Sequence, residues 1–141
     1  RNLFMKIKRV FELHSEIFSK EFREYTLIVG DKSQDVFTFF GVDELHGLKM
    51  SECYDKPGDV YIAGLCNVFP QDESKVFLFL NTSRFGGDFR DPLLIMHECF
   101  HLALELKGRD LSVGDLEEEV ITWSEEEAAV IYQLLKSQNL I

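Results

Sequence analysis

The chain has 141 residues, of which 45% are hydrophobic and 28% are charged, a balance typical of a globular protein with one hydrophobic core. Fifteen Lys and Arg against 25 Asp and Glu give a formal net charge of -10, which repels phosphate backbones and anionic membrane surfaces. This composition argues against a nucleic-acid partner, and the length predicts a single domain over residues 1–141.

The cysteine content and the absence of long apolar runs bear on localisation. The chain has 3 cysteines, an odd number, and no Cys-x-x-Cys spacing, so a disulfide framework is not indicated. No apolar run approaches the ~20 residues that cross a bilayer, and the N-terminus lacks the pattern of a signal peptide. We therefore expect a cytoplasmic protein without a membrane partner.

The first half of the chain predicts one helix followed by strands. Over residues 4–22, apolar residues recur at steps of three and four with charges between them, which indicates an amphipathic helix. Runs rich in β-branched and aromatic residues before Gly or Pro then predict strands over 25–29, 35–40 and 60–69. After a turn, the unbroken apolar run in 75–81 is typical of a strand covered on both faces, and it should form a hairpin with the strand before it.

The second half predicts two helices. Asp91-Pro92 is typical of a helix start, apolar residues keep helical spacing over 93–106, and Gly108 should end that helix. A second helix is expected over 115–136, with apolar residues along one broad face. The expected fold class is α+β, in which a small, mostly antiparallel sheet packs with an N-terminal helix, the helix at 93–106 and a C-terminal helix.

The first of these two helices contains His97-Glu98-Cys99-Phe100-His101, which fits the pattern His-Glu-x-x-His. Two histidines four residues apart project from one helix face and can share one tetrahedral metal ion. Glu98 is rotated by about 100° from His97, so its carboxylate should lie beside such an ion and accept a proton from a metal-activated water. The motif predicts a Zn²⁺ site with His97 and His101 as ligands and Glu98 as the catalytic base.

A third metal ligand has to come from elsewhere in the chain. Catalytic zinc normally has three protein ligands, and no histidine follows His101. A carboxylate of the following helix is the expected donor, and the candidates are Glu117, Glu118, Glu119, Glu125, Glu126 and Glu127. The helical wheel places Glu127 nearest the centre of the apolar face, where a carboxylate must be paired. The residues alone leave this choice open.

The motif and the acidic helix after it resemble the gluzincin clan of zinc peptidases, and within it the compact ImmA/IrrE-type metallopeptidases, over residues 91–135. In that clan the third ligand is a Glu on the following helix, commonly in Glu-x-x-Ala. The resemblance therefore implies Glu125 as the third ligand, and the helical wheel keeps Glu127 as second choice. Two residues depart from the family pattern, since Phe100 replaces the usual Gly before the second His and Ala129 replaces a polar residue.

The resemblance also implies a zincin-like metallopeptidase that hydrolyses a peptide or protein substrate. In such enzymes an extended substrate lies antiparallel to the strand before the motif helix, here residues 75–81, and either Tyr132 or His46 could stabilise the oxyanion. Two alternatives stay open: a catalytically inactive binding or regulatory domain with the same fold, and a metal-dependent hydrolase that acts on other bonds. The sequence predicts neither the natural substrate nor the oligomeric state.

Overall fold

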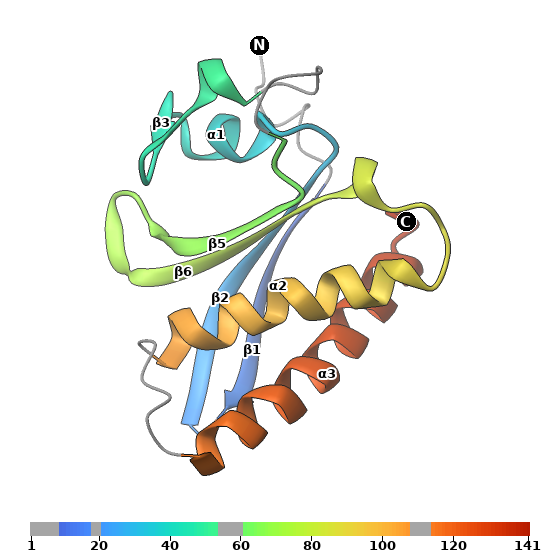
Figure 1. Ribbon diagram of the computed structural model, residues 1–141. Coiled ribbons are helices and arrows are strands. Elements are labelled where there is room, and N and C mark those ends of the chain that lie inside the picture. Colours follow the sequence, from blue (N-terminus) through green and yellow to red (C-terminus); the bar gives the residue numbers. More distant parts are fainter. Residues whose placement is uncertain (1–8, 18–20, 54–60, 108–113) are drawn as a thin grey trace.

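The computed structural model describes residues 9–17, 21–53, 61–107 and 114–141, and its centre is a four-stranded sheet in the order β1-β2-β6-β5 (Figure 1). Within this sheet β2 and β6 run parallel, whereas β1–β2 and β5–β6 are antiparallel pairs. The pairing of β5 with β6 confirms the predicted hairpin. The strands are β1 (Arg9–Ile17), β2 (Glu21–Gly30), β5 (Gly64–Phe69) and β6 (Asp72–Asn81).

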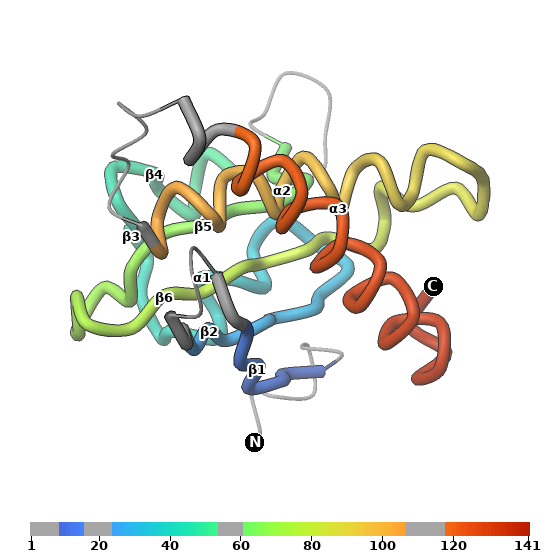
Figure 2. Tube along the Cα trace, turned by 90° about the horizontal axis from the view of Figure 1, so that it is seen from below, coloured from blue at the N-terminus to red at the C-terminus, as the bar shows by residue number. Residues whose placement is uncertain are grey.

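Helices cover both faces of the sheet. The long helices α2 (Arg90–Lys107) and α3 (Gly114–Ser137) pack against each other on one face, where α2 lies over β5 and β6 and α3 reaches β1 (Figures 1 and 2). The other face carries α1 (Asp35–Phe40) and a small hairpin of β3 (Glu44–Leu45) and β4 (Leu48–Lys49). Two short 3₁₀ helices complete the described structure, η2 (Met50–Glu52) and η3 (Thr82–Arg84). The α+β fold class is confirmed.

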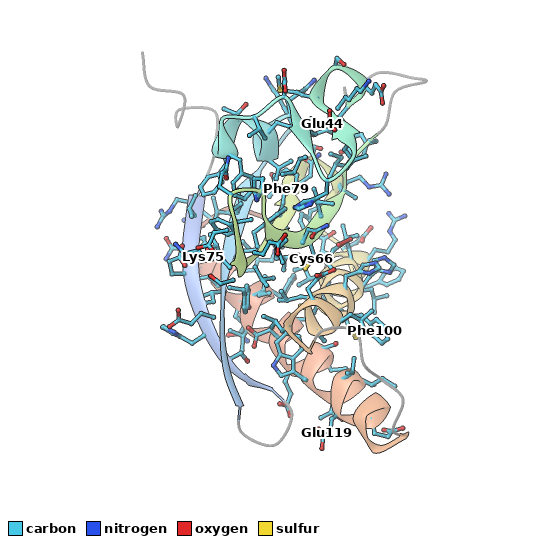
Figure 3. The ribbon with its side chains drawn as sticks, turned by 90° about the vertical axis from the view of Figure 1, so that its left-hand side faces the viewer. Glu44, Cys66, Lys75, Phe79, Phe100 and Glu119 are labelled. Atoms are coloured by element: carbon cyan, nitrogen blue, oxygen red, sulfur yellow. The ribbon has the colours of Figure 1, made fainter. Side chains whose placement is uncertain are left out.

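The central strands are buried on both faces because elements pack on each side of them. In β6, Leu78 and Leu80 belong to the core under α2 and α3, whereas Phe77 and Phe79 belong to the core under α1. Figure 3 labels Phe79. The prediction that this run is covered on both faces is therefore confirmed. In the described part of the chain, no helix is long and apolar enough to span a bilayer.

The helix expected over residues 4–22 is wrong where the structure describes it, because residues 9–17 form β1. Phe11 and Leu13 pack against the core while the residue between them is exposed, which is the alternation of a strand. Over residues 9–17 the positions of the apolar residues fit both the helical repeat of about 3.6 residues and the strand repeat of two. Pairing with β2 decides the outcome, since it provides partners for the backbone groups of an apolar strand. The rest of the predicted helix falls in β2 or outside the described residues.

The strand expected over residues 35–40 is also wrong, because these residues form α1, the first helix in the described part of the chain. The buried Asp35 carboxylate accepts hydrogen bonds from the backbone N–H groups of Asp31 and Lys32 (2.9 and 3.1 Å) at the start of the helix. Gly41 takes the left-handed conformation (φ 67°) that ends it. Asp35 at the start and Gly41 at the end are both visible in the sequence, but the aromatic residues between them favoured a strand.

Helices α2 and α3 occur where they were predicted, but the start of α2 differs in detail. The carboxylate of Asp91, the expected capping group, accepts hydrogen bonds from the backbone N–H groups of Gly86-Gly87 and so fixes the loop before the helix. Asp88 takes the capping role instead, since its carboxylate accepts from the backbone N–H of Arg90 (3.0 Å). Gly108, the expected end signal, lies outside the described residues.

Candidate active site

His97 and His101 lie one turn apart on the exposed face of α2. Their ring centroids are 5.0 Å apart and their planes meet at 77°. Two accessible imidazoles at this separation can each turn a ring nitrogen toward one ion between them, which is the arrangement that a shared metal requires. The structure therefore brings together the two histidines of the motif.

Glu98 leaves this exposed face and points toward the edge strand β5. Its side chain is only 6% exposed, and it lies so close to Gly64 that a Cβ atom added there would be 2.5 Å from Cδ of Glu98. Burial raises the pKa of the Glu98 carboxyl group above its ordinary value, and the nearby His97 partly opposes this shift. A desolvated carboxyl group next to two accessible histidines has the environment in which general bases are found.

Phe100 lies on the opposite flank of α2 from Glu98. Helix α2 sits over β5 and β6 and packs against α3, which in turn reaches β1, so β5 and α3 are on different sides of α2. Because each residue advances by about 100° around the helix, Phe100 falls on the α3 side of the histidine pair. Its ring is 37% exposed (Figure 3). A carboxylate that reaches the histidines from α3 has to pass this aromatic ring.

Glu125, the ligand that the resemblance implies, is exposed on α3. Across the residues that the structure describes, no three His, Cys, Asp or Glu side chains form a group that could hold a metal ion. Among the described residues, the structure therefore brings together the two histidines of α2 without a third ligand. On α3, Glu119 has a buried carboxylate oxygen, Oε2, without a hydrogen-bond partner, which is a costly arrangement for a carboxylate.

Glu127, the second choice for the third ligand, is built into the core between α3 and the sheet. Its side chain is 7% exposed, and its carboxylate accepts hydrogen bonds from the Tyr25 hydroxyl and from Oγ of Ser15 (3.0 Å). Nε1 of Trp123 also donates to Oγ of Ser15 (2.9 Å), so the network joins α3 to β1 and β2. A carboxylate at this position is paired, as expected, but its partners are hydroxyl groups of the sheet.

Replacing Glu125 and Glu127 separately should have opposite effects on stability and on zinc binding. Glu127→Ala removes the acceptor of two hydroxyl groups, so we expect the free energy of unfolding to fall by roughly 2 kcal/mol in urea titrations, with zinc binding unchanged. Glu125→Ala, at an exposed position, should change stability by less than about 0.5 kcal/mol and weaken zinc binding. Loss of zinc in Glu127→Ala, with stability unchanged, would contradict this assignment.

The resemblance implies that residues 75–81 align a substrate, whereas their apolar run predicts a core strand. The structure confirms the core strand, because these residues lie inside the sheet, and the alignment role is wrong. Strand β6 pairs with β2 on one side and with β5 on the other, so both of its edges are in use. The edge of the four-stranded sheet on the α2 side belongs to β5, which has no second strand partner among the described residues. The sequence indicates which segments are strands, but the order of the strands depends on contacts between distant segments. An extended peptide next to Glu98 would have to add to β5.

The two side chains considered for oxyanion stabilisation have other interactions. The Val68 carbonyl in β5 accepts a hydrogen bond from Nε2 of His46 (2.6 Å), at the tip of the β3–β4 hairpin. This hydrogen bond joins the β3–β4 hairpin to the edge strand β5. On α3 the half-buried Tyr132 ring lies 5.7 Å from Nζ of Lys136. Neither of these interactions involves the histidine pair.

Cys99, inside the motif, belongs to the core under α2 and α3. Burial raises the pKa of its thiol, and the charges of Glu127 and Glu98 raise it further, so the reactive thiolate is disfavoured. Cys99 is therefore a small buried hydrophobic side chain of the core.

Comparisons with known proteins assign no family: no protein-family model matches the chain, and searches of curated proteins and of solved structures find no match. The functional interpretation therefore depends on α2, on the edge strand β5 beside it and on the chemistry of the three motif side chains.

Proposed function

We propose that this chain is a zinc-dependent peptidase in which His97 and His101 bind the metal and Glu98 is the general base. The observation that carries the proposal is the histidine pair, whose rings lie 5.0 Å apart on the exposed face of α2, directly beside a buried carboxyl group. Accessible neutral imidazoles are good zinc ligands, and a desolvated carboxylate is a stronger base than one in water.

Each part of the site has a distinct role in this proposal. A bound zinc ion would supply Lewis acidity, which polarises the scissile carbonyl and lowers the pKa of water. Glu98 takes a proton from the attacking water and returns it to the leaving amine. Glu125 is the proposed third ligand, and the free edge of β5 offers backbone groups to an extended peptide or protein substrate.

The cellular setting in this proposal is the cytoplasm. Cys53, Cys66 and Cys99 form no disulfide, as suits a reducing compartment. The formal net charge of -10 disfavours nucleic acids and anionic membrane surfaces as partners, which leaves peptides and proteins as the expected substrates.

Metal removal tests the proposal directly. We expect the purified protein to contain one zinc per chain by elemental analysis and to cleave members of a peptide library, with products identified by mass spectrometry. Dialysis against a chelator should abolish cleavage, and added zinc should restore it, because Glu98 alone cannot polarise the carbonyl. Cleavage that persists at the same rate in metal-free protein would contradict the proposal.

Phe100 favours a second function, a catalytically inactive domain of the same fold that binds or regulates a partner. Its ring occupies the flank of α2 from which a third ligand on α3 would approach, and an incomplete ligand set does not support hydrolysis. The same experiment separates the two functions. Zinc uptake without cleavage of any peptide favours the binding domain, whereas cleavage that depends on zinc favours the peptidase.

A further inference from the structure

Strand β5 begins with a glycine at the point where the side chain of Glu98 meets the sheet. We infer that Gly64 is a positioning residue for the general base: the missing side chain at residue 64 creates the space that the Glu98 carboxylate occupies. This inference rests on the proposed function, because it assigns Gly64 a role in the same reaction.

The side chain of Glu98 lies very close to the position that a Cβ atom at residue 64 would occupy. A Cβ atom at residue 64 would lie 2.5 Å from Cδ, 2.7 Å from Cγ and 2.8 Å from Oε1 of Glu98. Favourable contacts between carbon atoms occur at roughly 3.5–4.0 Å, so a methyl group at residue 64 would require a relative movement of about 1 Å. Any residue other than glycine therefore excludes the present position of the carboxylate.

The backbone of the edge strand is held in place, so the side chain has to move. Gly64 pairs with Leu80 of β6, and the backbone N–H of Asn81 donates to the carbonyl of Ala63 (2.9 Å). The buried side-chain amide of Asn81 also donates to the carbonyl of Ile62 (2.9 Å). Retreat of the strand would break hydrogen bonds in a buried region, whereas Glu98 can change its rotamer at lower cost.

Displacement of Glu98 should lower the rate of proton transfer and leave zinc binding unchanged. Proton transfer needs the base within hydrogen-bond reach of the water, and a misplacement of about 1 Å can reduce the rate about 100-fold. His97 and His101 are exposed on α2, and the three atoms nearest to a Cβ at residue 64 all belong to Glu98. Substitution at Gly64 should therefore lower kcat while zinc remains bound.

The test compares Gly64→Ala with Gly86→Ala as a matched control, because a Cβ at residue 86 would meet its nearest neighbour, Oδ2 of Asp88, at an ordinary 3.7 Å. We expect Gly64→Ala to keep one zinc per chain and an unchanged KM while kcat falls about 100-fold, and Gly86→Ala to match wild type. In a Glu98→Gln background, adding Gly64→Ala should cause no further loss. An unchanged kcat would overturn the inference. So would a raised KM at constant kcat, which indicates blocked peptide binding, or a full additional loss in the double variant.

A crystal structure of Gly64→Ala separates failure of this inference from failure of the proposed function. We expect Cδ of Glu98 to lie about 1 Å or more from its wild-type position, with β5 unmoved, whether or not the protein cleaves peptides. An unmoved Glu98 with a shifted β5 would overturn the positioning role. Absence of cleavage by the wild-type protein would overturn the peptidase proposal, and the structure would then decide the positioning of Glu98 alone.

Discussion

Replacement of His97 or His101 with Ala should abolish stoichiometric zinc binding and, with it, hydrolysis. Each substitution leaves one imidazole and the proposed ligand Glu125, and two ligands do not complete the set of three that catalytic zinc normally has. We expect zinc affinity to fall by more than 100-fold, beyond the ~10–100-fold that loss of an outer-shell partner causes. Elemental analysis and competition with a chromogenic chelator measure this loss.

A matched control is available on the sheet. His14 in β1 is exposed and pairs with Glu24 (3.3 Å), so His14→Ala removes a surface histidine without touching α2. This variant should bind zinc like wild type. Full zinc retention in both His97→Ala and His101→Ala would reject the ligand assignment.

Glu98→Gln should eliminate hydrolysis while zinc remains bound. The amide matches the carboxylate in size and fits the space beside Gly64, but it cannot accept a proton, so we expect a rate loss of about 10²–10⁴-fold. Zinc content by elemental analysis and cleavage of the best peptide substrate measure the two effects. Cleavage at the wild-type rate would remove Glu98 from the mechanism.

The same substitution should stabilise the metal-free protein at neutral pH. Burial raises the pKa of Glu98 in the folded state, so the folded protein holds this proton more tightly than the unfolded chain does. The resulting penalty is absent below the ordinary pKa of 4.5, grows as the pH rises above that value and is complete above the folded-state pKa. Thermal unfolding in chelator should therefore show Glu98→Gln melting above wild type at pH 7, with the difference lost near pH 4.

The parts of the site that depend on one helix were predictable from sequence. The relation among His97, Glu98 and His101 follows from helical geometry alone, and α2 occurs where the apolar spacing indicated it. The helical wheel likewise placed Glu127 in a buried position, and the structure confirms this burial. Its partners could not be predicted, because Tyr25 and Ser15 precede it by more than a hundred residues and no local pattern links them.

The parts that depend on the sheet were not predictable in the same way. Residues 9–17 form a strand because they pair with β2. Residues 75–81 form a central strand because β5 pairs with their outer side and is itself the edge strand. Both outcomes depend on contacts between distant segments, which hydrophobic periodicity does not encode. Gly64 did carry a local signal, since a lone glycine in a strand pattern often marks a close approach by another element.

The network around Glu127 also has a consequence for how the protein is made. Glu127 on α3 accepts hydrogen bonds from hydroxyl groups of β1 and β2, so these two strands leave the ribosome before the helix that completes the core between them and α3. Until then the aromatic side chain of Tyr25 lacks its partner on α3. This interval is when the protein should be most prone to aggregation and most dependent on chaperones.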